Sequence, residues 1–215
     1  MSRKLLYILC LTLLLSACGG PDKPTISLYL AVQRGDIDQV ERHIYWDSEI
    51  NAPFPNGRYP LHEAANAGRI ILVKLLIKNG ADLSVEDSLA YTPIDLAILS
   101  GRTQAAEVLR KAGAGFDASR LLLAAAKRDT EDRDVVRFLK SHGADMEARS
   151  SNGDTALLIA AKRANNRLLH HLAEQGSDIN AQDAEGQTAL DIATRKGSME
   201  LVGFLQRNGG VSGSQ

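Results

Sequence analysis

The sequence of 215 residues has little of several features that would assign it to a familiar class of protein. It has only two cysteines, which excludes a small domain held together by disulfides. Aromatic residues make up only 5% of the chain, so we do not expect a core of stacked rings. The formal charge of -1 argues against a nucleic-acid-binding protein that depends on overall positive charge. These totals describe an average globular chain.

Long apolar runs are also scarce. The strongest one, from Leu5 to Ala17, has thirteen mostly apolar residues, whereas a helix needs about twenty to cross a bilayer. It follows the basic pair Arg3-Lys4 and ends in small residues. This order predicts a signal peptide over residues 1–17, which takes no part in the fold.

The end of this segment, Leu15-Ser16-Ala17-Cys18, resembles the lipobox of bacterial lipoproteins. The resemblance implies a diacylglycerol and an N-acyl chain such as palmitate on Cys18, with residues 18–25 as a short tether. Because Gly19 rather than aspartate follows, the usual sorting rule favours the periplasmic side of the outer membrane over the inner membrane. An ordinary secretory signal with a chance cysteine is the alternative. The mature chain would keep no thiol for a disulfide.

Short motifs recur at a fixed spacing through the rest of the chain. Glycines at 80, 113, 143, 176 and 209 are 33, 30, 33 and 33 residues apart. A second motif keeps the same step and a small-residue pair follows it each time. The second motif comprises Tyr59-Pro60-Leu61-His62, Thr92-Pro93-Ile94-Asp95, Thr155-Ala156-Leu157-Leu158 and Thr188-Ala189-Leu190-Asp191. Internal repetition with this period is typical of a solenoid.

These motifs resemble the ankyrin repeat, in which a turn precedes two antiparallel helices. The resemblance implies an all-α solenoid of about six helix-turn-helix repeats with short finger loops, covering residues 26–215. Proline suits a first helical turn, and glycine suits the left-handed position after a helix. The first copy is degenerate: Asp47 replaces the terminal glycine, and His43 stands where an apolar residue is expected.

The fourth copy departs most from the repeat. From Gly113 to Ala125 there are 12 residues where Gly80 to Ala97 has 17, so its finger is shortened. The charged segment 128–134 between its helices is longer than usual and is expected to protrude on the opposite side. We therefore expect a notch in the row of fingers. It is either a gap shaped for a partner or ordinary decay of a repeat.

No catalytic, cofactor or metal motif is found. The chain has no Gly-x-Ser-x-Gly, no phosphate-binding glycine loop and no zinc spacing. His170 and His171 are adjacent, and adjacent helical residues point in different directions, so we do not expect them to share a metal ion. His62 is predicted to bond the backbone of a turn, and Asp95 and Asp191 to cap helices.

Ankyrin-type solenoids bind partners on a concave face formed by fingers and by the residues after each small pair. In the last three repeats these residues form three basic pairs: Lys127-Arg128, Lys162-Arg163 and Arg195-Lys196. One interpretation is a basic track for an acidic partner surface or for anionic headgroups. The other is that helix C-termini simply favour cations.

The fingers of the first half carry aromatic residues. Phe54, Arg58 and Tyr91 are candidate partner-binding residues, because aromatic and arginine side chains often anchor interfaces. Phe54 is equally able to tuck beneath its own loop. Trp46, close to the tether, is expected to pack under the first finger or to touch the membrane interface.

Taken together, the sequence predicts a monomeric, non-catalytic module that binds a protein, binds no nucleic acid and needs no cofactor. The overall design resembles lipid-anchored ankyrin proteins that serve as immunity partners of type VI secretion effectors, notably phospholipases. This resemblance implies a secreted lipase as partner. The alternatives are a periplasmic scaffold or stress-protection protein supporting an envelope enzyme, and an enzyme whose catalytic group lies in the notch.

Overall fold

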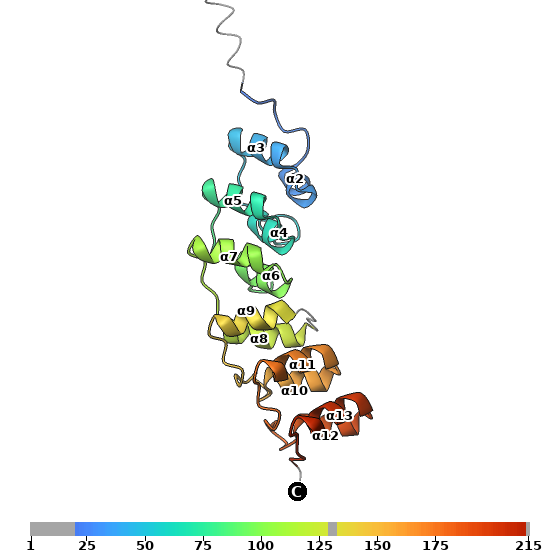
Figure 1. The fold of residues 1–215 in the computed structure, drawn as a ribbon. Coiled ribbons are helices and arrows are strands. Elements are labelled where there is room, and N and C mark those ends of the chain that lie inside the picture. Colours follow the sequence, from blue (N-terminus) through green and yellow to red (C-terminus); the bar gives the residue numbers. More distant parts are fainter. Residues whose placement is uncertain (1–19, 129–132, 214–215) are drawn as a thin grey trace, which may run out of the picture.

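The computed structural model describes residues 20–128 and 133–213, which form an elongated stack of helix pairs (Figure 1). The predicted lipobox with Cys18 and most of the charged segment 128–134 lie outside these residues. Within them all secondary-structure elements are helices, and there is no strand. The helices are α2 (Leu28–Arg34), α3 (Ile37–Tyr45), α4 (Pro60–Asn66), α5 (Ile70–Lys78), α6 (Pro93–Leu99), α7 (Thr103–Lys111), α8 (Ala118–Lys127), α9 (Arg133–Ser141), α10 (Ala156–Arg163), α11 (Asn166–Glu174), α12 (Ala189–Arg195) and α13 (Met199–Arg207).

The repeated motif begins the first helix of each later pair. In α6, the Thr92 hydroxyl accepts a hydrogen bond from the Asp95 N–H while the Asp95 carboxylate accepts one from the Thr92 N–H. Thr188 and Asp191 form the same reciprocal cap on α12. Such caps satisfy backbone donors that a helix leaves unpaired at its start. The predicted capping role of both aspartates is confirmed.

His62 occupies the corresponding cap position in α4. Its Nδ1 accepts from the Tyr59 N–H at 3.3 Å, and its Nε2 lies 2.8 Å from the Tyr91 carbonyl on the next finger. Burial lowers the pKa of His62, and the hydrogen bond to that carbonyl only partly offsets the shift. His62 therefore links two neighbouring fingers in its neutral form, as the sequence predicted for a structural histidine.

Left-handed residues end the second helices. Gly80 has φ 86°, a conformation that costs glycine little. After α3 the same place is taken by Asp47 at φ 56°, which confirms that aspartate replaces the glycine there. His43 is held in the first repeat by the Ile26 carbonyl at 2.8 Å and by the Ser48 hydroxyl at 2.9 Å, so a polar side chain fills an apolar position without an unmet hydrogen bond.

Small and branched side chains form one continuous core between the stacked pairs. The small pairs Ala64-Ala65, Ala125-Ala126 and Ala160-Ala161 are buried and let neighbouring first helices approach closely. Leucine, isoleucine and valine from both helix layers fill the remaining space. First helices stack on first helices and second helices on second helices along the array (Figure 1). No helix among the described residues combines the length and apolar character needed to cross a bilayer.

The described part of the tether, from Gly20 on, packs against the first repeat. The Trp46 indole donates to the Pro21 carbonyl at 3.0 Å, and the Thr25 N–H donates to the Gln39 side chain at 2.8 Å. Lys23 lies 5.3 Å from the centre of the Trp46 ring. The expectation that Trp46 packs under the first finger is wrong: its hydrogen bond holds it against the tether, where it stays 46% exposed.

The fingers have one common length except before the fourth pair. Residues 79–92 connect α5 to α6, and residues 142–155 connect α9 to α10, but only residues 112–117 connect α7 to α8. Part of the lost loop is replaced by helix, because α8 begins one turn earlier relative to its small pair than α12 does. The predicted shortening is thus present and places helical residues Ser119 and Arg120 where a finger would otherwise lie.

Candidate functional site

The gap left by the short fourth finger is an open notch of about 520 Å³. Its described lining comes from three successive repeats, since the Tyr91 finger, helix α8 and the finger around Ser150 all contribute. The lining residues are Tyr91, Asp117, Ser119, Arg120, Leu123, Ala124, Lys127, Arg128, Ala148, Arg149, Ser150 and Ser151. Four of them are cationic, and Asp117 is the only carboxylate. The notch predicted from repeat spacing is therefore a real and strongly basic feature.

The Tyr91 ring contacts two of the four cationic side chains, Arg120 and Arg128. The Arg128 guanidinium lies 4.5 Å from the ring centre and that of Arg120 lies 5.7 Å from it. Both distances are within the range of a cation–π attraction. Arg120 also pairs with the buried carboxylate of Asp95 in α6. Tyr91, predicted as a finger anchor, thus organises the wall of the notch.

Arg149 is fixed by neutral groups. One of its terminal nitrogens donates to the Gly153 carbonyl at 2.6 Å and to the Gln182 carbonyl at 2.8 Å. These carbonyls orient the guanidinium between two fingers, but they do not cancel its charge. Arg149 was not among the residues selected from sequence, because it stands in a finger rather than after a small pair.

Lys127 and Lys162 occupy equivalent positions in neighbouring repeats but have different surroundings. The Lys162 Nζ lies 2.7 Å from Asp154 and 3.0 Å from Asp183. The Asp154 and Asp183 side chains are 9% and 1% exposed, so Lys162 is clamped by two nearly buried carboxylates. Lys127 is exposed, and within residues 20–128 and 133–213 no carboxylate pairs with it.

The clamp shifts the pKa values of Lys162 and Asp183. Burial by itself would lower the pKa of Lys162, but hydrogen bonds to Asp154 and Asp183 outweigh it and raise that pKa. Burial would likewise raise the pKa of Asp183, yet the hydrogen bonds from Lys162 and from the N–H groups of Gln187 and Glu185 lower it. Lys162 therefore stabilises its two neighbours and contributes little free charge to the surface.

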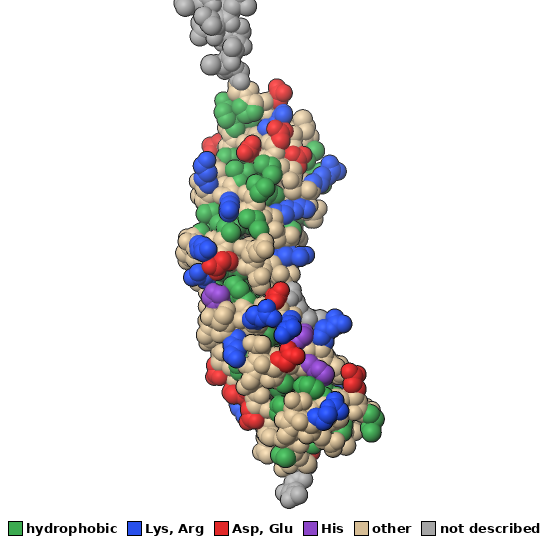
Figure 2. All heavy atoms as spheres, in the orientation of Figure 1, with side chains coloured by type: hydrophobic (Ala, Val, Ile, Leu, Met, Phe, Trp, Pro, Cys, Tyr) green, Lys and Arg blue, Asp and Glu red, His purple; other side chains and the backbone are tan. Residues whose placement is uncertain are grey.

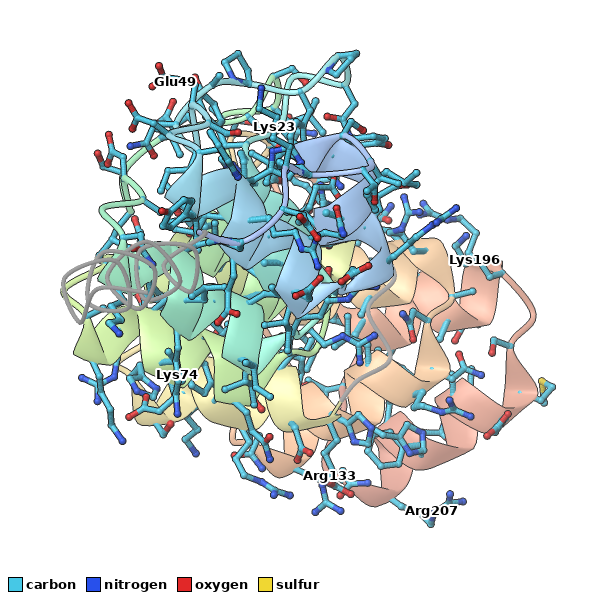
Figure 3. All side chains as sticks on the ribbon, turned by 90° about the horizontal axis from the view of Figure 1, so that it is seen from above. Lys23, Glu49, Lys74, Arg133, Lys196 and Arg207 are labelled. Carbon is cyan, nitrogen blue, oxygen red and sulfur yellow. The ribbon has the colours of Figure 1, made fainter. Side chains whose placement is uncertain are left out.

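The remaining candidate residues fall into two groups. Phe54 is half-buried, and its ring meets Tyr29 edge-on at 4.9 Å, so it packs on the first repeat. Arg58 lies 3.6 Å from both Glu63 and Asp87 and is held inside the array. Arg163, Arg195 and Lys196 are exposed at helix ends. Figure 3 shows Lys196 at one edge of the array, away from Lys74, Arg133 and Arg207 on the side of the second helices.

The histidine pair of α11 has separate contacts. The His170 ring stacks on Phe204 at 3.7 Å, while His171 lies 3.8 Å from Glu174. In the part of the chain that the structure describes, no three histidine, cysteine, aspartate or glutamate side chains form a possible metal site.

Hydrophobic side chains gather at the N-terminal end of the array. Tyr45 is 59% exposed, and its ring meets Trp46 at 5.8 Å. On the face shown in Figure 2 a hydrophobic patch lies at the N-terminal end of the described array, and basic side chains project along the long edges. Exposed hydrophobic side chains also lie at the C-terminal end, where Met199 is 78% and Val211 57% exposed.

Comparisons with known proteins match this architecture. A family profile described as ankyrin repeats, in three copies, matches residues 28–120 and again residues 121–212. Among curated proteins, L-asparaginase of Dirofilaria immitis is 31% identical over 153 residues, which is 68% of this chain and 25% of that protein. The chain thus spans a quarter of that relative.

Solved structures share the fold over most of the chain. The ankyrin repeat domain of Bcl-3 is 25% identical with a TM-score of 0.70, and the match covers 88% of this chain and 89% of that one. A chain in the complex of the Bdellovibrio bacteriovorus predatory endopeptidase Bd0816 with the immunity protein Bd3460 is 24% identical, with a TM-score of 0.67. That match covers 86% of this chain and 99% of that one.

Proposed function

The chain belongs to the ankyrin-repeat family, whose members are generally non-catalytic interaction modules, and from that premise we propose that it is a lipid-anchored binding protein of the periplasm. The observation that carries the proposal is the basic notch, an open site of about 520 Å³ in a row of fingers that is otherwise regular. Arg128 is held by a tyrosine ring and Arg149 by two carbonyls, so these two cations are oriented before a partner arrives. Preorganised charge of this kind favours specific recognition of a protein surface.

Catalysis has no support in the notch. The groups that line it are arginines, one lysine, one aspartate and three serines, together with Tyr91 and apolar residues. Asp117 caps α8 by accepting from the Arg120 N–H at 2.9 Å. Ser119 accepts from the Asp145 N–H at 2.9 Å, and no histidine lines the described part of the notch to activate a hydroxyl. We therefore propose binding without turnover.

We further propose that the partner is a secreted effector of the type VI system, in particular a membrane-attacking phospholipase, and that this chain is its immunity protein. Lipidation of Cys18 would hold the array beside the phospholipid that such an enzyme attacks. Anchoring raises the local concentration of an inhibitor where it is needed. The ankyrin chain in the endopeptidase–immunity complex supports the idea that this fold suits an immunity role, although the likeness extends only to the fold.

The outer membrane is proposed as the location because Gly19 follows Cys18. The tether packs against the first repeat, which supports a short distance between the membrane and the array. Gly20 is only two residues beyond Cys18, a span of at most about 7 Å. Gly20 lies so close to Tyr45 that a Cβ at this position would meet the Tyr45 hydroxyl. A lipid on Cys18 would therefore lie near the exposed pair Tyr45 and Trp46. Release of the protein into the soluble fraction by Cys18→Ser is the expected result, checked by membrane fractionation and mass spectrometry of the N-terminal peptide.

A competition assay tests the immunity proposal. Cells lacking this chain should lose viability beside a competitor with an active type VI system, and the wild-type chain should restore it. Lys127→Glu should restore it poorly, whereas Lys196→Glu, an equal charge change outside the notch, should restore it well. Equal survival with and without the chain would contradict the proposal. An oxidative-stress defect in the absence of any competitor would favour the scaffold alternative instead.

A further inference from the structure

The notch contains an incomplete version of the clamp that holds Lys162. Asp154 lies at the end of the finger before α10, whereas the finger before α8 is shortened and helix takes its place, with Ser119 inside α8. Asp183 opens its finger by donating its N–H to the Gln187 carbonyl, and Ser150 opens the preceding finger by donating its N–H to the Asp154 carbonyl. One carboxylate that clamps Lys162, Asp183, is thus replaced by Ser150, and the place of the other, Asp154, is lost with the shortened finger. Ser119 and Ser150 both line the notch.

From this correspondence we propose that the notch is a receptor for a carboxylate, contributed by an acidic segment of the protein partner. The incoming carboxylate lies beside Lys127 as Asp183 lies beside Lys162, near Arg128 and Arg149. The proposal deepens the binding function argued above and rests on it, but its chemistry can be tested without the partner.

Charge complementarity supports an anionic occupant. Arg120 is already paired with Asp95, and among the lining residues that the structure describes this leaves Lys127, Arg128 and Arg149 against one carboxylate, Asp117. Arg128 is held on the Tyr91 ring, and Arg149 is held by two carbonyls. Two of the three cations therefore lose little conformational freedom when an anion binds. Arginine donors also match the geometry of a carboxylate.

The shape of the notch supports a protein segment rather than a flat surface. The shortened finger opens a gap between the Tyr91 finger and the Ser150 finger, and helix α8 forms its floor. Leu123 and Ala124 supply an apolar floor beside the cations. An acidic side chain with its aliphatic stem fits this combination.

Ser150→Asp is the variant that tests the proposal, because the fold already accepts aspartate at this place in two other fingers. Asp87 accepts hydrogen bonds from the N–H groups of Leu89 and Tyr91, and Asp183 accepts them from those of Glu185 and Gln187. Ser150 makes only a weaker version of this turn, accepting from the Asn152 N–H at 3.3 Å. The new aspartate should reach Lys127 as Asp183 reaches Lys162 and fill the receptor from within.

The probe is a hexaglutamate peptide blocked at both ends, with hexaglutamine as its neutral counterpart. The full chain is held in non-ionic detergent at about 10 mM salt, where the screening length is about 30 Å. We expect hexaglutamate but not hexaglutamine to bind, and Ser150→Asp to weaken binding about tenfold. Asn152→Asp adds the same charge at the tip of the same finger and should change the affinity less than about twofold.

Three outcomes would overturn the receptor: no hexaglutamate binding by the wild-type chain, equal binding by Ser150→Asp, or binding of inorganic phosphate in preference to the peptide. Thermal unfolding of Ser150→Asp should match or exceed that of the wild-type chain, which shows that lost binding does not come from misfolding. Hexaglutamate binding together with no effect in the competition assay would leave the receptor standing and remove the immunity function.

Discussion

Two lysines at the same position of neighbouring repeats show how one missing loop changes the chemistry of a surface. Lys162 lies between Asp154 and Asp183, and its side chain is only 33% exposed. Lys127 has Ser150 at the position corresponding to Asp183, has no counterpart of Asp154 because its finger is shortened, and faces a notch. The sequence motif that brings each lysine to its helix end is the same, so the difference arises entirely from the fingers around it.

Cationic side chains are paired with carboxylates where the fingers are complete, and they are free to meet a partner beside the shortened finger. Arg58 is paired with Asp87 across complete fingers, just as Lys162 is paired with Asp154 and Asp183. At the fourth repeat the shortened loop removes this compensation and exposes cations that tyrosine and carbonyl groups hold in place. The net charge of the chain is near zero because it averages over both situations.

The largest expected effect is on stability at the clamp. Lys162→Gln should lower the free energy of unfolding by about 2 kcal/mol, because it leaves two nearly buried carboxylates without their charged donor. Lys127→Gln should change it by less than about 0.5 kcal/mol, because the Lys127 side chain is exposed and pairs with no carboxylate in the described part of the chain. Urea unfolding followed by circular dichroism gives both values. Equal losses in the two variants would show that the lysines are equivalent after all.

A smaller effect is expected when the two sites are interchanged. Ser150→Asp should raise the free energy of unfolding by about 0.5 kcal/mol, because it adds a partly exposed ion pair with Lys127. Asp183→Ser should lower it by about 1 kcal/mol, because it removes one carboxylate and weakens the turn hydrogen bonds. Thermal unfolding of the two single variants and of their combination measures this exchange. Destabilisation by Ser150→Asp would contradict the structural correspondence between the fingers.

The smallest effect concerns acid. The pKa of Asp183 is lowered in the folded chain, so the unfolded chain takes up a proton first as pH falls. The clamp therefore stabilises fully above about pH 4 and loses this contribution as pH falls through the folded-state value. Asp183→Ser should flatten the fall of stability in acid, and Ser150→Asp should steepen it.

Unfolding midpoints measured from neutral to acidic pH test these slopes. Asp191, whose pKa is lowered to about 2, provides a common background in every variant. Burial would raise that pKa, but hydrogen bonds from Ser212, Thr188 and Gly213 outweigh it. If the unfolding midpoints of the wild-type chain and Asp183→Ser fell in parallel with pH, the clamp would not contribute to the acid dependence of stability.

Most of the fold followed from the sequence, because its causes are local and repeated. Capping threonines, terminal glycines and small pairs stand at one spacing, and the array, the notch and the capping roles of Asp95 and Asp191 could all be predicted from them. His62 could also be assigned, because its place in the repeated motif determines what it contacts.

The site was harder to predict, because charge compensation depends on contacts between repeats. The three basic pairs look equivalent in the sequence, and nothing near Lys162 in the chain shows that Asp183 reaches it from the next finger. Arg120 and Arg149 do not stand after a small pair, and their contacts to Asp95 and Gln182 cross a repeat boundary, so the repeat pattern did not select them. Aligning the fingers would have helped: it sets Ser150 against Asp87 and Asp183.

Lys127 lies in an open receptor while Lys162 lies in a closed one, and side-chain NMR of the lysine Nζ groups can distinguish the two. The full chain in detergent is titrated with hexaglutamate, and the two signals are assigned through Lys127→Gln and Lys162→Gln. We expect the Lys127 signal to move with saturation while the Lys162 signal stays in place. Equal movement of both signals, or movement of Lys162 alone, would contradict it.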